Sequence, residues 1–214
     1  MQLVDRIEKR RFVGRELLLW LWFESELFEG TLSTKEHGEF GLWIERQLTI
    51  SSGKEVTRIK GGYPAGSREA KEALLLGKLP EVFGMHLSWR ERECNFVLKA
   101  ETLALAGLSL PTVLGAEDAP AELLDRPTPK KKRKAESPDP SDAQHEVFYE
   151  RMMLAREVEG LVEALYRDFL VLRLGPTWDT LVAPALKAWS RGEDGVDADD
   201  YRKVRDAALG KKRR

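Results

Sequence analysis

Histidine and cysteine are the side chains whose own pKa values lie nearest to neutral pH, and this sequence has four of them. They are His37, His86, His145 and Cys94. The histidines are far apart in the chain, and none has the spacing to other ligands that metal sites share. The sequence also contains no HExxH motif, phosphate-binding loop, glycine-rich dinucleotide motif or nucleophile elbow. We therefore predict a protein that is not an enzyme and that has no catalytic residue, no metal and no cofactor.

Two of these residues have simpler structural interpretations. His86 alternates with apolar residues in an expected strand, where a hydrogen-bonded structural histidine is far commoner than a catalytic one. Cys94 lies at the edge of another apolar segment, which favours a small buried hydrophobe. As the only cysteine of the chain it can form no internal disulfide, and this fits a reducing compartment.

Lysine and arginine are the second source of chemistry, because they gather in three separate runs. The runs are Lys9, Arg10 and Arg11; Lys130, Lys131, Lys132, Arg133 and Lys134; and Lys211, Lys212, Arg213 and Arg214. Each cation placed on a phosphate releases counterions, which gives affinity for nucleic acid without any reading of sequence. A single run is as often a solvated tail or linker, but three runs in one small protein favour nucleic acid.

The middle run, with the preceding Pro129, also has the form of a monopartite nuclear-import signal. Such hexamers arise easily in a lysine-rich linker. The sequence therefore leaves three interpretations of residues 129–134 open: an arm that binds DNA, an import signal, or a solvated linker.

The overall composition is that of a soluble globular protein with a highly charged surface. Of the 214 residues, 42 % are hydrophobic and 33 % are charged, and the length suits one large or two small domains. The formal net charge is −1, so any electrostatic binding must come from local patches. No apolar run approaches the length of a membrane span, and residues 1–6 do not form a signal peptide. We expect a cytoplasmic protein with no membrane partner.

Segment 14–27 is predicted to be a helix with hardly any polar face. It carries Trp20, Trp22 and Phe23 together with several leucines. A helix that is apolar nearly all round is buried on several sides. Packing in the protein core is therefore the main interpretation of these aromatic rings, and base stacking or a dimer contact are the alternatives.

Residues 39–110 are predicted to form a small antiparallel sheet with a helix packed on it. Segment 39–50 could begin as a helix turn, but its end alternates like a strand and is followed by a turn. Further strands are expected at residues 55–60, 82–89, 94–100 and 103–110, with a charged turn at 90–93. The alternation in the first of these places Arg58 and Lys60 on the solvent face.

Four further helices are expected from the apolar spacing and from capping residues. They span residues 68–76, 146–174, 178–189 and 197–209. Ser67 and Thr177 are candidate N-caps of the first and third of these helices, and Gly77 and Gly210 end the first and the last. The long helix could cover the N-terminal helix within one chain, which we favour, or form the seam of a dimer.

These elements predict an α+β fold in four parts. Residues 1–111 form an α+β domain, and residues 112–145 form a disordered linker that is basic and rich in proline. Residues 146–210 form a helical region that packs back on the first domain or makes a dimer contact, and residues 211–214 form a basic tail. Disorder is expected in the linker because its composition cannot bury enough apolar surface to offset the entropy of ordering.

The segment GRELLLWLW at residues 14–22 resembles the GREFLxWLW segment of the recombination-associated protein RdgC-like family. The order of the later features is also similar, over residues 43–45, 56–60, 68–78, 87–89, 96–98 and 108–110. The similarity covers roughly residues 11–111 and, more loosely, the helices after the linker.

This resemblance implies a nucleoid-associated protein that binds double-stranded DNA without sequence preference. In the family, a ring-shaped homodimer encloses the duplex in a basic channel and restrains the RecA recombinase. Because this chain is much shorter than the long form of the family, we carry over DNA binding and leave ring closure open. The resemblance thus adds a recombinase and a second copy of the chain to the expected partners.

The sequence supports two hypotheses of function. In the first, the protein binds double-stranded DNA through phosphate contacts made by the three basic runs and by Arg58 and Lys60 on the sheet. In the second, it is an interaction or scaffold module that dimerises through the N-terminal helix and the helix at 146–174, with no nucleic acid.

Overall fold

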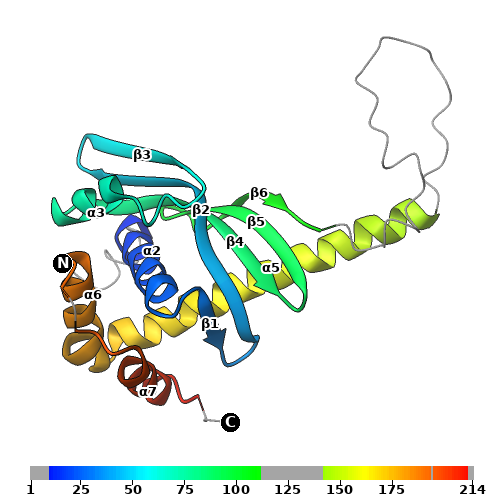
Figure 1. The fold of residues 1–214 in the computed structure, drawn as a ribbon. Helices are drawn as coiled ribbons and strands as arrows, with labels where there is room; N and C mark the ends of the chain where they lie inside the picture. Colours follow the sequence, from blue (N-terminus) through cyan, green and yellow to red (C-terminus); the bar gives the residue numbers. More distant parts are fainter. Residues whose placement is uncertain (1–9, 112–141, 194, 212–214) are drawn as a thin grey trace.

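The computed structural model describes residues 10–111, 142–193 and 195–211. Its elements, in chain order, are α2 (Arg10–Leu27), β1 (Thr31–Thr34), β2 (Gly38–Ser52), β3 (Glu55–Gly61), α3 (Arg68–Leu75), β4 (Leu79–Trp89), β5 (Arg92–Lys99), β6 (Leu105–Ser109), α5 (Asp142–Leu174), the π-helical turn η1 (Trp178–Val182), α6 (Ala183–Ser190) and α7 (Ala198–Ala208). The chain thus has the α+β fold that the sequence predicts, with an antiparallel sheet and a helical C-terminal region (Figure 1).

The sheet has six strands and is built around the long strand β2. The hydrogen-bonded order is β1-β2-β4-β5-β6, and β3 also pairs with β2. Because β4 takes one edge of β2, β1 and β3 share its other edge, one near each end. All of these pairs are antiparallel, and consecutive strands are joined by short turns wherever they are neighbours.

A bulge in the middle of β2 bends this strand. Ile44 faces Met85 and Leu48 faces Phe83, so the segment 45–47 lies opposite a single residue of β4. Within the bulge, Arg46 has a φ angle of 66°. Extra residues on one strand increase its local bend and twist, and Figure 1 shows β2 curving strongly along its length.

Several boundaries differ from those expected from the sequence. Residues 39–50 are strand throughout, so the expected helix turn at their start is wrong. Strand β1 was missed, because Thr31–Thr34 is too short to show an alternation of its own. Of the linker 112–145, residues 112–141 lie outside the described residues, whereas 142–145 belong to α5.

Helix α2 lies between the sheet and the C-terminal helices (Figure 1), and its large side chains form the centre of the core. Trp20, Trp22 and Phe23 are each at most 1 % exposed. Trp22 meets Phe83 of β4 edge-on, with 5.9 Å between ring centroids. The core interpretation of these rings is therefore confirmed, and burial excludes base stacking on them.

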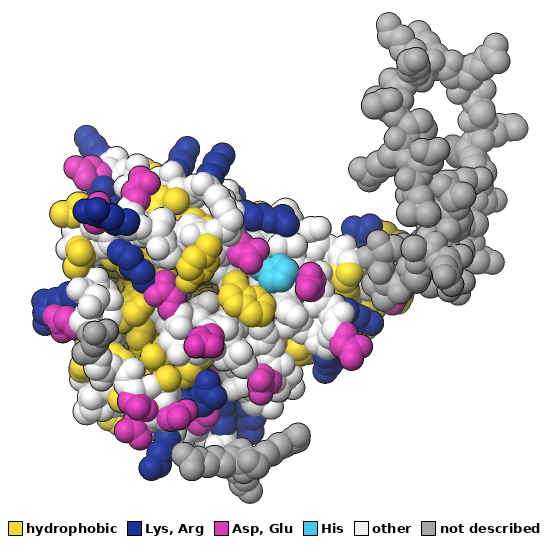
Figure 2. Space-filling model, in the orientation of Figure 1, with side chains coloured by type: hydrophobic (Ala, Val, Ile, Leu, Met, Phe, Trp, Pro, Cys, Tyr) yellow, Lys and Arg dark blue, Asp and Glu magenta, His cyan; other side chains and the backbone are white. Residues whose placement is uncertain are grey.

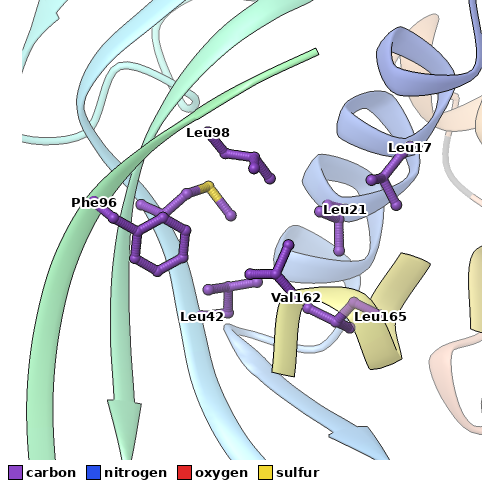
Figure 3. Close-up of a pocket in the computed structure, with 8 residues that line it drawn as sticks. Leu17, Leu21, Leu42, Phe96, Leu98, Val162 and Leu165 are labelled. Atoms are coloured by element: carbon purple, nitrogen blue, oxygen red, sulfur yellow. The ribbon is translucent and has the colours of Figure 1, made fainter. Parts of the chain in front are cut away.

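Where α2, the sheet and α5 meet, apolar side chains alone line a small void. Figure 3 shows side chains of all three elements pointing toward one another there, with Leu17 and Leu21 from α2 and Val162 and Leu165 from α5. They enclose a void of about 10 Å³. A void of this size with apolar walls stays dry, because a buried water needs polar partners.

Helix α5 packs on α2 of the same chain. The rings of Trp20 and Phe169 lie 5.7 Å apart, and the Arg173 guanidinium donates to the Glu16 carboxylate at 2.6 Å. Figure 1 shows that the first turns of α5 extend past the sheet. The long helix therefore has a covered C-terminal part and a more exposed start.

The C-terminal helices close the far side of α2. Asp197 accepts a hydrogen bond from the amide of Asp200 and caps α7. Thr177 makes no such bond, so its prediction as an N-cap is wrong. The cause is local, because Thr177 already has helical φ and ψ angles, whereas a capping residue needs an extended backbone. Helix α3, in contrast, is capped by Ser67 as expected.

A buried ion pair joins α2 to α7. Arg205 donates to the Glu24 carboxylate at 2.6 Å, and Tyr201 donates to its other oxygen at 3.2 Å. Both charged side chains are at most 3 % exposed. Burial raises the pKa of Glu24 even though Arg205 favours its charged form. Removing the cation therefore leaves a costly buried carboxylate.

We predict that Arg205→Met lowers the free energy of unfolding by about 3–5 kcal/mol, because Glu24 loses its partner. The folded variant binds the Glu24 proton more tightly than the unfolded chain does, so its stability falls as pH rises through the folded pKa. Urea unfolding at acidic and at neutral pH measures both effects. The control is Arg202→Ala, whose exposed cation lies one turn earlier in α7. Equal losses in the two variants would contradict the role of the ion pair.

Candidate nucleic-acid interface

The face of the sheet that points away from α2 carries no helix among the described elements. Along β2 and β4 the side chains alternate between buried ones, such as Ile44 and Phe83, and partly exposed ones, such as Thr49 and Val82. We call this second set, with its partners on β3 and β5, the outer sheet face. Its members are Trp43, Glu45, Gln47, Thr49, Arg58, Lys60, Val82, Gly84, His86, Ser88, Glu93, Asn95, Val97 and Lys99.

Arg58 and Lys60 are exposed on this face, as the strand alternation predicts. They stand two residues apart on β3, about 7 Å along the strand. The pairing register aligns Arg58, through Thr49 and Val82, with Lys99 of β5. No carboxylate of the described residues lies within ion-pair distance of these three cations. They are therefore free to meet an anion from outside.

The other predicted cations are either outside the described part or held to the fold. Lys9, Lys130, Lys131, Lys132, Arg133, Lys134, Lys212, Arg213 and Arg214 lie outside the described residues, as do the side chains of Arg10, Arg11 and His145. Lys211 pairs with Asp168 at 2.9 Å and donates to the carbonyl of Ser33 at 2.7 Å. Lys211 is therefore bound to other parts of the fold and is not a free cation.

Trp43 and His86 form the aromatic part of the outer sheet face. They face each other across β2 and β4, with 5.7 Å between ring centroids. His86 in turn lies opposite Asn95 of β5, and their side chains are 3.2 Å apart at Nδ1 and Oδ1. The hydrogen bond expected for His86 is therefore present.

Two glycines let the Trp43 ring lie flat against the sheet. A side chain on Gly41 would overlap one end of the indole, and a side chain on Gly30 would overlap the other end. Sequence reasoning missed Trp43 as a surface residue. The signal was present, because Trp43 is out of phase with the buried series Phe40, Leu42 and Ile44.

Charge on the outer sheet face is mixed. Glu45 and Glu93 share it with the three cations. Figure 2 shows Lys and Arg side chains standing out along the edge where Figure 1 places β3, with acidic side chains among them. The cations are thus concentrated toward β3 and do not form a continuous basic surface.

A second depression lies between the loop before β6 and helix α5. Its volume is about 290 Å³, and its polar side chains are Glu159, Glu163 and Tyr166. Carboxylates repel phosphate, so this groove lacks the charge that nucleic acid requires.

The remaining reactive groups give no second site. Cys94 is 2 % exposed on the covered side of the sheet, and burial raises the pKa of its thiol. In the described ranges, no three His, Cys, Asp or Glu side chains are grouped so that they could hold a metal ion. None of the described helices combines the length and the apolar character that a membrane crossing requires.

Comparisons with known proteins add no relative. No protein-family profile matches the chain, and no curated protein is similar to it at a significant level. The likeness to the RdgC-like family therefore rests on the residues of segment 14–22 and on the order of the later features.

We predict that Gly41→Ala destabilises the protein by about 1–3 kcal/mol, because the new methyl group overlaps the Trp43 ring. Gly61→Ala is the matched control: it changes a strand glycine with open space around it, so it is neutral or slightly stabilising. Chemical denaturation measures both. In a double variant with Trp43→Ala, the cost of the Gly41 change should largely disappear. Additive losses would show that the ring does not depend on Gly41.

Proposed function

We propose that this protein binds DNA through its backbone phosphates, without reading sequence, and that the outer sheet face is part of the contact surface. The observation that carries the proposal is the group of exposed cations Arg58, Lys60 and Lys99 without described carboxylate partners on one open sheet face. Phosphates would neutralise these cations and release bound counterions, which gives affinity for any sequence.

The cations that face α2 from the helical side differ from those of the outer sheet face, because they are already paired. There, cations such as Arg173 and Arg205 each meet a carboxylate of α2 at 2.6 Å. A cation that is already paired gains little from a phosphate, because it must first give up its partner. The unpaired cations of the outer sheet face carry no such cost.

The basic runs and the family resemblance extend the proposal beyond the sheet. The runs at 9–11, 130–134 and 212–214 add cations within the same chain. The resemblance to the RdgC-like family favours double-stranded DNA, a place in the nucleoid, a homodimer and a recombinase as partner. These finer features are part of the proposal, and experiment must test each of them.

The first test is fluorescence anisotropy of the full chain with a duplex of arbitrary sequence over a series of salt concentrations. We predict that Arg58→Ala with Lys60→Ala weakens binding to every sequence and reduces the log–log salt slope by about 1.8, at about 0.9 for each lost phosphate contact. The physical reason is the loss of two counterion-releasing contacts.

The matched control is Lys187→Ala with Lys203→Ala. It removes the same charge from exposed positions in α6 and α7, on the helical side of the molecule. Its salt slope should equal that of the native protein. Equal effects of the two double variants would show that net charge, and not the outer sheet face, governs binding.

A scaffold role without nucleic acid has one observation in its favour. Near the start of α5, Phe148 and Tyr149 are 66 % and 65 % exposed, and Met153 is also exposed. Helix α2 cannot serve as the dimer surface of that hypothesis, because its apolar side chains are buried within the fold. A dimer contact through α5 would thus have exposed apolar side chains available in its first turns.

If the chain dimerises there, Phe148→Asp should convert a dimer into a monomer, because a buried unpaired charge is costly at an interface. Light scattering after size exclusion measures the mass. Val171→Asp, at an exposed position near the other end of α5, is the control and should leave the mass unchanged. A monomeric native protein would remove the scaffold hypothesis.

A further inference from the structure

We propose that the Trp43 ring stacks on an unpaired nucleobase, so that the outer sheet face takes single-stranded nucleic acid. The base would lie on Trp43, and the strand would run along β2 toward Lys60 and Arg58. This inference rests on the proposed function, because it assumes that the same face meets phosphates, and it adds the kind of strand that fits.

Contacts at both ends of the indole fix the orientation of the Trp43 ring. Both ends of the indole lie against backbone, one over Gly41 and the other over Gly30. His86 borders the ring across the strand pair. A ring held in this way is fixed before any ligand arrives, so stacking costs little side-chain entropy.

The solvent exposure of Trp43 also favours stacking. Trp43 is only partly buried, whereas Trp20 and Trp22 of α2 are closed off from solvent. Its indole N–H donates to no other described residue. In contrast, the indoles of Trp22 and Trp189 both donate to Glu26. Trp43 thus combines a partly exposed ring with support at both ends, because its N–H end lies against Gly30 and its other end lies against Gly41.

The way the Trp43 ring lies on the sheet favours single strands over duplex. Bases in a duplex are covered by their neighbours, and reaching them requires a side chain that projects as a wedge. Trp43 lies along the sheet and does not project from it. Such a ring can accept only a base whose face is already free, as in a single strand, a loop or an end.

The position of the cations beside β2 also favours a single strand. Trp43 and Gln47 share β2 and lie at most about 13 Å apart along the strand. Lys60 faces Gln47, and Arg58 faces Thr49, the next outward residue. An aromatic platform beside a line of cations is the combination that binds single strands without sequence preference. Glu45 lies between Trp43 and Gln47 and opposes the phosphates at this point.

The experiment uses the full chain and labelled oligonucleotides of about 16 nucleotides, the upper site size of single folds that bind this way. The probes are oligo-dT, oligo-U and a duplex of the same length. We expect Trp43→Leu to weaken oligo-dT binding about tenfold and to leave duplex binding unchanged. Trp43→Phe, which keeps a ring, should restore most of the affinity. Glu45→Gln should strengthen binding to all probes.

The control for losing an aromatic side chain is Tyr149→Leu, on α5 and away from the outer sheet face. Equal weakening by Trp43→Leu on single strand and duplex would overturn stacking. Stacking would also be overturned if the Arg58 and Lys60 double variant weakened oligo-dT binding and Trp43→Leu did not. In those cases the phosphate-binding proposal would survive. If the native protein binds no probe at low salt, both proposals fall. The dT and U arms decide between DNA and RNA as the source of the base.

Discussion

The burial of helix α2 on every side is the constraint on which the rest of the structure depends. Trp22 packs against Phe83 of the sheet, Trp20 packs against Phe169 of α5, and Phe23 meets aromatic rings of α6 and α7. Fully burying one such side chain contributes about 1.5–3 kcal/mol. Because the sheet and helices α5, α6 and α7 all share this one helix as their core, the sheet and the C-terminal helices form a single hydrophobic unit.

Apolar burial alone has no direction, so the carboxylates of α2 determine how its neighbours dock. Glu16 binds Arg173 of α5, and Glu24 binds Arg205 of α7. Glu26 accepts the indole N–H groups of its own helix and of α6, at 2.7 and 2.8 Å. Glu26 also pairs with Lys71 of α3, so the acidic residues that lie beside the apolar residues of this segment hold all of the packed helices in place.

The sequence predicted the elements that have a long hydrophobic period. It did not predict features that depend on pairing or packing with distant residues. The 3–4 spacing predicted α5 nearly to its ends, and alternation identified β3 and β4. The bulge at residues 45–47, the short strand β1 and the helical backbone of Thr177 depend on pairing and packing that no local pattern encodes. Trp43 could have been found from its phase in β2, because the buried residues of that strand alternate around it.

Covering one face of the sheet also decides where a ligand can bind. An antiparallel sheet can leave its second face to solvent, and here the covered face takes the apolar core together with the paired cations. The uncovered face carries Arg58, Lys60 and Lys99, which have no described carboxylate partner, and the Trp43 ring, which lies against two glycines. Under the proposed function, Glu45 would limit how strongly that face attracts phosphate, so stacking on Trp43 and charge on β3 would have to act together. Neither an isolated ring nor two surface cations would hold a strand, because each contributes only a few kcal/mol against the entropy lost on binding.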